Sequence, residues 1–162
     1  MFGLRILWFL NRITTTLFYK CMYRHSIVLP FSCKFRFGFN IVIASKKAKI
    51  KIGDNCFFNN YCSINAMSTI QFGNDVIVGE NVKIYDHNHK YNNSNVLIKE
   101  QGFSLSPVVI GNNCWIGSNV TILKGVTIGD NCVIGAGCVI FKNVPSNTLV
   151  INKQELIFKN YI

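Results

Sequence analysis

The sequence predicts an all-β domain built as a solenoid, specifically a parallel β-helix. Two observations carry this prediction: an aliphatic residue returns every six positions, and glycine often follows it directly. A fixed hexapeptide period is typical of a β-helix in which each repeat supplies one short strand and one corner. The leading positions of the repeat are Ile52, Phe58, Ile64, Phe72, Val78 and Ile84, followed by Ile110, Ile116, Ile122, Ile128, Ile134 and Ile140.

The first third of the chain carries the excess positive charge. The 162 residues have a net charge of +10, and no acidic residue precedes Asp54. Residues 1–33 predict a basic amphipathic helical segment, since apolar residues and Trp8 surround the arginines. Two roles stay open for it: an end cap on the solenoid, or a helix lying on a membrane surface, which this composition favours over nucleic acid. Its apolar runs are shorter than the roughly 20 residues that span a bilayer, and no signal-peptide pattern is present.

The seven cysteines predict neither disulfides nor a metal site. Valine fills the fifth place of many repeats, and cysteine at that place acts as a small hydrophobic residue pointing inward. No CxxC pair is present, so we expect no zinc. Reduced core cysteines without a secretion signal predict a cytoplasmic protein. The fifth-place cysteines are Cys56, Cys62, Cys114, Cys132 and Cys138.

The solenoid is expected over residues 34–151, and it has one large interruption. Regular coils are placed at 52–69, 72–89, 110–127 and 128–145, with a two-residue insert (Ile70, Gln71) at one corner. Glycine in second place is expected to supply the positive φ that tight corners need. Residues 90–107 lack the hexad pattern, and a loop this long inside a solenoid predicts function. Residues 152–162 are expected to form a tail that closes the C-terminal end.

The chemistry-bearing residues stand at the foot of this loop, in the run Tyr85-Asp86-His87-Asn88-His89. Histidine is the side chain best suited to removing a proton from a hydroxyl or amine near neutral pH. Asp86 is close enough along the chain to orient one of the two imidazoles. The alternative interpretation is a pair of exposed loop histidines without a role.

Two segments carry a resemblance to a known family: FGNDVIVGENVKIYDHNH, and VVIGNNCWIGSNVTILKGVTIGDNCVIGAGCVIFKNVP after the loop. Residues 72–145 resemble the hexapeptide-repeat acyltransferases, in particular the galactoside and maltose acetyltransferases and the O-acetyltransferases of bacterial surface polysaccharides. The resemblance implies a left-handed parallel β-helix and a homotrimer with active sites between subunits. It also implies acetyl-CoA as co-substrate, no metal, and transfer of the acetyl group to a sugar hydroxyl. Surface polysaccharide assembly, in the cytoplasm or at the inner face of the membrane, is the expected setting.

The resemblance also implies roles for single residues. His89, which directly precedes the loop, matches the general base, with His87 as the alternative and Asp86 beside them. Asn59 and Trp115 match positions near the acceptor. A backbone N–H near Gly117 or Ser118 is expected to stabilise the oxyanion. The residues matched to acetyl-CoA binding are Gly117, Ser118, Ala136 and Lys142, and Lys159 of the tail is expected to add a phosphate contact.

Several alternatives stay open on the sequence alone. The acceptor could be serine or an amino-sugar nitrogen, and a non-catalytic binding scaffold would show the same hexads. A carbonic anhydrase of the same fold needs three histidine ligands, but the repeat domain has only His87 and His89. The chain also departs from the family at Phe141 and at 152–154, where the nucleotide end of CoA is expected. The sequence does not identify the acceptor.

Overall fold

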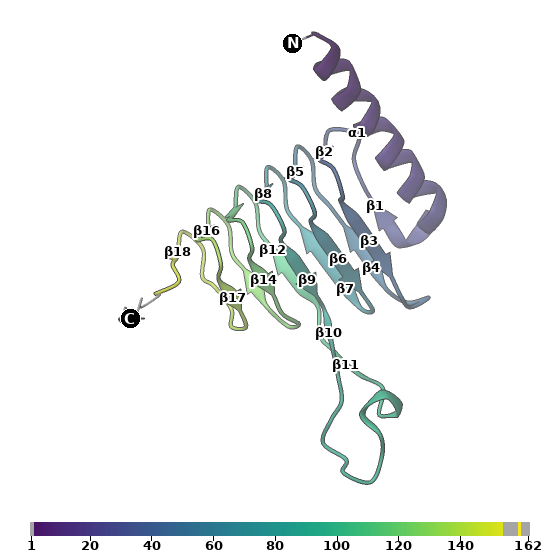
Figure 1. The fold of residues 1–162 in the computed structure, drawn as a ribbon, viewed down its shortest axis with the longest axis vertical. Helices are drawn as coiled ribbons and strands as arrows, with labels where there is room; N and C mark the ends of the chain where they lie inside the picture. The colour runs from purple at the N-terminus through teal and green to yellow at the C-terminus, as the bar shows by residue number, and fades with distance from the viewer. Residues whose placement is uncertain (1, 154–158, 160–162) are drawn as a thin grey trace.

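The computed structural model describes residues 2–153 and 159. Helix α1 (Phe2–Tyr23) and a short 3₁₀ turn, η1 (Arg24–Ser26), lead into a solenoid of parallel strands (Figure 1). Each coil runs along three sides, and each side belongs to one parallel sheet. The predicted parallel β-helix with an N-terminal helix is confirmed.

Successive coils stack strand on strand in three sheets. The first sheet contains β1 (Ile27–Val28), β4 (Lys49–Lys51), β7 (Thr69–Phe72), β12 (Val108–Ile110) and β15 (Thr127–Ile128). The second contains β2 (Lys34–Phe35), β5 (Phe57–Phe58), β8 (Ile77–Val78), β13 (Trp115–Ile116), β16 (Val133–Ile134) and β18 (Leu149–Val150). The third contains β3 (Asn40–Ile43), β6 (Ser63–Ala66), β9 (Lys83–Tyr85), β14 (Thr121–Ile122) and β17 (Val139–Ile140).

The register places the same repeat position of each coil one above the other. Ile116 pairs with Val78 on one side and Ile134 on the other, and all three are buried. The fifth-place valines and cysteines form a second set of inward columns. Because strand residues alternate between the two faces, this register sends one residue of each short strand into the core. The hexad phase is therefore confirmed.

Two details of the predicted coil boundaries differ. The insert at Ile70 and Gln71 was assigned wrongly to a corner, because both residues lie inside β7, where Ile70 pairs with Ile50 and Val108. Ile70 and Phe72 both point into the core, so the strands of the first sheet carry two inward residues here. At the other end, the coil begins at β1, before residue 34, since Ile27 pairs with Ile50.

The second-place glycines of the repeats serve close packing rather than positive φ. Positive φ falls two residues later, mostly on asparagine or aspartate, as at Asn119 (58°). Gly117 itself has no such φ, but a Cβ there would lie 2.7 Å from the backbone nitrogen of Ala136. The expectation that second-place glycine supplies the corner conformation was wrong. Asparagine tolerates the left-handed region, and glycine allows the next coil to approach.

The buried cysteines are not merely small hydrophobic residues. The Cys62 thiol donates to the carbonyl oxygen of Gly79 at 3.0 Å, and the Cys114 thiol donates to that of Gly129 at 3.1 Å. Burial raises the pKa of Cys62 to about 11 and also raises the pKa of Cys114. These thiols therefore stay protonated and link neighbouring coils. All seven cysteines are free, and Cys21 is the exposed one.

Helix α1 covers the first coil with one face. Thr16 and Tyr19 are buried there, and the Tyr19 hydroxyl donates to the Phe39 carbonyl at 3.2 Å and accepts from the Ile41 N–H at 3.1 Å. The Tyr23 hydroxyl donates to the Ile41 carbonyl at 3.1 Å. These bonds satisfy backbone groups at the open end of the third sheet, where no further strand pairs.

No helix in the described ranges is both long and apolar enough to pass through a lipid bilayer. The solenoid ends at β18, which pairs with β16. The tail predicted at 152–162 lies largely outside the described residues.

Candidate active site

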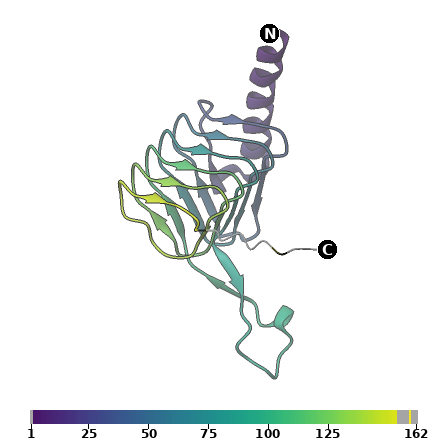
Figure 2. The ribbon, with the colours of Figure 1, turned by 60° about the vertical axis from the view of Figure 1, so that its left-hand side comes forward.

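The interruption of the hexads is an antiparallel ribbon that projects from the solenoid (Figure 2). Strand β10 (His87–His89) pairs with β11 (Phe103–Leu105), and a short 3₁₀ turn, η2 (Ile98–Glu100), lies beyond them. The ribbon leaves the corner after β9 and returns to β12, so it emerges between the third and first sheets. The segment predicted as a loop, 90–107, therefore contains β11, and the histidines lie in the facing strand.

Asp86 anchors the foot of the ribbon. Its side chain is fully buried, and its two carboxylate oxygens accept hydrogen bonds from the backbone N–H groups of Met67 (2.8 Å) and Ser68 (2.7 Å). Those groups form the same corner of the preceding coil. A third contact joins Asp86 Oδ1 to His87 Nδ1 at 3.0 Å. Asp86 therefore orients His87, not His89, and fixes the ribbon to the coil below it.

His89 lies two residues further out and is exposed. Its ring stacks at a tilt against Phe103, with centroids 4.5 Å apart, in the directly opposite position of the ribbon. The His87 ring meets the same phenyl ring edge-on at 5.6 Å. Both imidazoles therefore share one face of the ribbon. No group in the described part of the chain forms a hydrogen bond with the His89 ring, which leaves its nitrogens open to an incoming molecule.

The residues matched to acetyl-CoA binding lie mostly on a different edge. Gly117, Ser118 and Ala136 occupy the corner between the second and third sheets, on the same edge as Asn59, which lies two coils before Gly117. The histidine ribbon occupies the corner between the third and first sheets. One side of a coil is about six residues, or roughly 20 Å of extended chain. A single chain therefore does not bring His89 to Ser118.

At the second edge, the backbone N–H groups of Ser118 and Ala136 lack an acceptor within the described residues. The Gly117 N–H donates to the Ile134 carbonyl at 2.7 Å, as the coil ladder requires. By contrast, no acceptor among the described residues is recorded for the N–H groups of Ser118 or Ala136. Ala136 is exposed and Ser118 is half-buried. These two groups, one coil apart, can bind the carbonyl or oxyanion oxygen of a ligand lying along the edge.

Comparison with known proteins agrees with this geometry. A family model described as "Bacterial transferase hexapeptide (six repeats)" matches residues 107–142. The chain is 29% identical, over 94% of its length and 88% of the other, to the Escherichia coli (strain K12) protein named "Putative lipopolysaccharide biosynthesis O-acetyl transferase". A maltose O-acetyltransferase from Clostridium difficile has a TM-score of 0.62 at 29% identity, covering 90% of this chain and 82% of that one. The chain is therefore similar to the hexapeptide-repeat acyltransferases in sequence and in fold.

Other relatives carry coenzyme A in their solved structures. A galactoside acetyltransferase in complex with coenzyme A has a TM-score of 0.63 at 28% identity, covering 86% of this chain and 76% of that one. The galactoside O-acetyltransferase of Escherichia coli (strain K12) is 38% identical over 67% of this chain. This acyltransferase spans about half of that relative, 52% of its length.

The remaining predicted residues are dispersed. Trp115 is 55% exposed on the outer face of the second sheet, between Ile77 and Val133. Lys142 is exposed at the corner that follows β17, on the same edge as the ribbon. Lys159 is exposed, and its neighbours in sequence lie outside the described residues. In residues 2–153 and 159, no three histidine, cysteine or acidic side chains are grouped to hold a metal ion.

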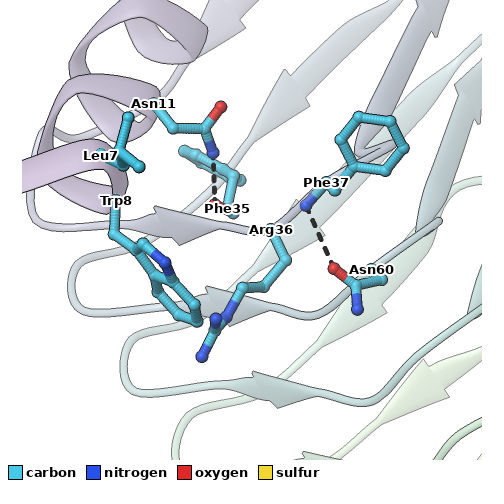
Figure 3. Close-up of a pocket in the computed structure, with 7 residues that line it drawn as sticks. All are labelled: Leu7, Trp8, Asn11, Phe35, Arg36, Phe37 and Asn60. Atoms are coloured by element: carbon cyan, nitrogen blue, oxygen red, sulfur yellow. Dashed lines mark hydrogen bonds between the residues drawn. The ribbon is translucent and has the colours of Figure 1, made fainter. Parts of the chain in front are cut away.

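A cavity of about 250 Å³ lies elsewhere, between α1 and the second sheet (Figure 3). Its lining includes Trp8, whose ring the Arg36 guanidinium covers, and Asn11, whose amide donates to the Phe35 carbonyl at 2.8 Å. The cavity contains none of the residues discussed above as catalytic. It marks the junction of helix and coil rather than the acyl-transfer site.

Sequence reasoning missed Phe103 and the partner of Asp86. Phe103 lies fourteen residues after His89, in a stretch without periodicity, and only the ribbon register brings the two rings together. The apolar alternation of Phe103 and Leu105 with polar Ser104 between them was the available signal for a strand. The sequence could not show which histidine Asp86 binds, because His87 and His89 are both close enough to it along the chain.

Proposed function

We propose that this acyltransferase moves the acetyl group of acetyl-CoA to a hydroxyl of a sugar, with His89 as the general base. The observation that carries the proposal is the exposed His89 ring, held on a rigid ribbon in a chain similar to acetyltransferases that bind coenzyme A. A base must reach the proton that it removes, and the open ring nitrogens of His89 meet that requirement.

His89 removes the proton from the acceptor hydroxyl as its oxygen attacks the thioester carbon. The negative charge that develops on the former carbonyl oxygen requires donors already in place. When the tetrahedral intermediate collapses, the carbon–sulfur bond breaks, and the protonated imidazole returns its proton to the departing thiolate. His87 is the alternative base, because the bond to Asp86 occupies only its Nδ1 and leaves Nε2 to accept a proton. In this proposal His87 also holds the ribbon to the coil below.

The free N–H of Ser118 is the donor that we assign to the oxyanion. Sequence left Gly117 and Ser118 as equal candidates, but the Gly117 N–H is already used within the coil. The Ala136 N–H, one coil further along, is placed to donate a hydrogen bond to the pantetheine arm. Lys142, and Lys159 from the tail, supply positive charge for the phosphates of the nucleotide end. Asn59 and Trp115 then face the acceptor side.

We propose that the active protein is a homotrimer with its active sites between subunits. His89 and Ser118 lie on different edges of one chain, so a neighbouring copy is needed to bring them together. The outer face of the second sheet supports association: Ile77 (52%), Trp115 (55%) and Leu149 (64%) form an exposed apolar column. Such a column is more apolar than the surface of a monomer usually is.

The sugar is proposed to belong to a surface polysaccharide under assembly. This rests on the similarity to relatives named for lipopolysaccharide biosynthesis and for galactoside acetylation. The work would take place in the cytoplasm, at the inner face of the membrane, where lipid-linked glycans are built.

A screen with radiolabelled acetyl-CoA tests the proposal, using cell-envelope sugars, their lipid-linked precursors, serine and amino sugars as acceptors. We expect label on a sugar hydroxyl, stable to conditions that spare amides. His89→Ala should lower kcat by about 10²- to 10⁴-fold while leaving binding of acetyl-CoA measured by calorimetry intact. Unchanged turnover in His89→Ala would remove His89 as the base. If calorimetry detected no binding of acetyl-CoA to the wild-type protein, the proposal that it is an acetyltransferase would be wrong.

A further inference from the structure

Helix α1 has a second face that the solenoid does not use. Thr16 and Tyr19 are buried on the side of the helix that packs on the first coil. Leu10 and Leu17 are exposed and lie along a line on the opposite side of the helix. The exposed apolar side chains on and beside that line are between 50% and 57% exposed: Leu10, Leu17, Phe18 and Met22. None of these positions carries a charge.

The direction of this face is fixed by contacts on the inner side of the helix. Tyr19 and Tyr23 bind backbone groups of β3 and the residue before it, and Asn11 binds the Phe35 carbonyl. Trp8 lies under the Arg36 guanidinium (Figure 3). These contacts lie along the length of the helix, so the side that carries Leu10 and Leu17 faces away from the end of the solenoid.

The charged residues of α1, η1 and the first coil are all basic, and they form a basic rim at this end of the molecule. Lys20 and Arg24 lie at the end of the helix, and Lys46 and Lys47 lie at the corner of the end coil that follows β3. No acidic residue precedes Asp54, and no carboxylate of the described chain pairs with any of these cations. The Nε atoms of Arg12 and Arg36 are buried without a hydrogen-bond partner in the described residues. This end of the molecule therefore complements a negatively charged surface.

We infer that the outer face of α1 docks flat on an anionic membrane, with the basic rim against the lipid headgroups. An interfacial helix buries leucine and aromatic side chains at the acyl boundary while basic residues bind anionic lipids. The solenoid then stands away from the membrane with its end coil toward it. This orientation rests on the helix and its charge, not on the proposed acetyl transfer.

A second copy of α1 is the competing occupant, and the width of the apolar face argues against it. A helix–helix seam uses a narrow line of two positions in seven. Here Phe18 and Met22 widen the face well beyond the line of Leu10 and Leu17, and Thr14 interrupts that line. A basic rim on both partners would also repel.

Vesicle flotation of the full chain tests the inference, using phosphatidylcholine vesicles with and without phosphatidylglycerol. Wild type should float with the anionic vesicles at low salt and much less at high salt, since surface charges are screened. Leu10→Glu/Leu17→Glu should lower the bound fraction by more than about tenfold. Lys46→Gln/Lys47→Gln should weaken binding about fivefold for each charge removed.

Leu97→Glu/Ile98→Glu is the matched control, because it makes the same change at two exposed residues of the distant ribbon. It should float as wild type does. Circular dichroism and light scattering confirm that each variant keeps its fold and oligomeric state. The inference is overturned if wild type does not float, if the α1 variant floats equally well, or if that variant loses subunits instead. Turnover of a soluble acceptor by the α1 variant is expected to stay at the wild-type level, which separates docking from catalysis.

Discussion

The Nδ1 atom of His87 lies 3.0 Å from Oδ1 of the fully buried Asp86. Since a carboxylate only accepts, this bond requires the proton on Nδ1. The same carboxylate accepts from two backbone N–H groups of the preceding coil. The pair therefore joins the ribbon to the solenoid, and it separates the two neighbouring histidines into an anchored one and an open one.

Replacing Asp86 with asparagine should destabilise the protein by about 2–3 kcal/mol. The side-chain NH₂ of asparagine is a donor, so at least one of the three N–H groups that donate to the Asp86 carboxylate would lose its acceptor. Thermal unfolding of Asp86→Asn measures the loss. Asp75→Asn is the matched control, since Asp75 is exposed and asparagine occupies the same repeat position elsewhere, as at Asn81. Equal melting temperatures for the two variants would contradict the anchoring role.

Removing the phenyl ring of Phe103 should impair turnover more than stability. Phe103→Ala frees the His89 ring to leave its position, so we expect kcat to fall about tenfold with the KM for acetyl-CoA little changed. Phe103→Leu keeps an apolar surface beneath the imidazoles and should retain most of the activity. Steady-state kinetics of both variants measure the effect. Equal kcat values for Phe103→Ala and wild type would show that the phenyl ring does not position the His89 imidazole.

A methyl group at Gly117 should cost about 1–3 kcal/mol of stability, because the new Cβ would lie 2.7 Å from the Ala136 nitrogen and 2.8 Å from the Ile134 oxygen. Gly135→Ala is its counterpart in the last coil, where the nearest atom, the Val150 oxygen, is 3.1 Å away. Chemical denaturation should show the larger loss for Gly117→Ala. The reverse order would mean that the coils adjust freely at that corner.

Stability should also fall at alkaline pH through Cys62. Its folded pKa of about 11 lies above the ordinary value near 9, so the protonated thiol stabilises the fold fully below pH 9. Above that pH the unfolded chain loses the proton first, and the advantage declines as pH rises toward 11. Relative to Cys62→Val, wild type should lose on the order of 2 kcal/mol of unfolding free energy by pH 11. Parallel pH curves for the two proteins would refute the shift.

The sequence was sufficient for the coil and insufficient for the contacts between segments. Hexad spacing identifies each inward residue, because a period of six repeats the same position in every coil. It does not reveal that Ile70 lies in a strand, because a longer corner and an added strand residue change the spacing equally. The same division holds for the candidate site: the break in the pattern points to His89 as a candidate, whereas Phe103 depends on cross-strand register. The sequence also does not show that the Ser118 N–H is available, because this depends on which backbone groups are already hydrogen-bonded between adjacent coils.

The ribbon leaves and re-enters the solenoid without disturbing it. The Ser106 N–H donates to the Asp86 carbonyl at 2.9 Å, and β12 pairs directly with β7 as if no residues intervened. The length and composition of the excursion are thus independent of core packing, and lengthening a closed loop costs little. Insertions, deletions and substitutions in this one segment can accumulate while the scaffold stays constant. The ribbon is in this sense a replaceable module, open to divergence or to engineering by loop exchange between residues 90 and 102.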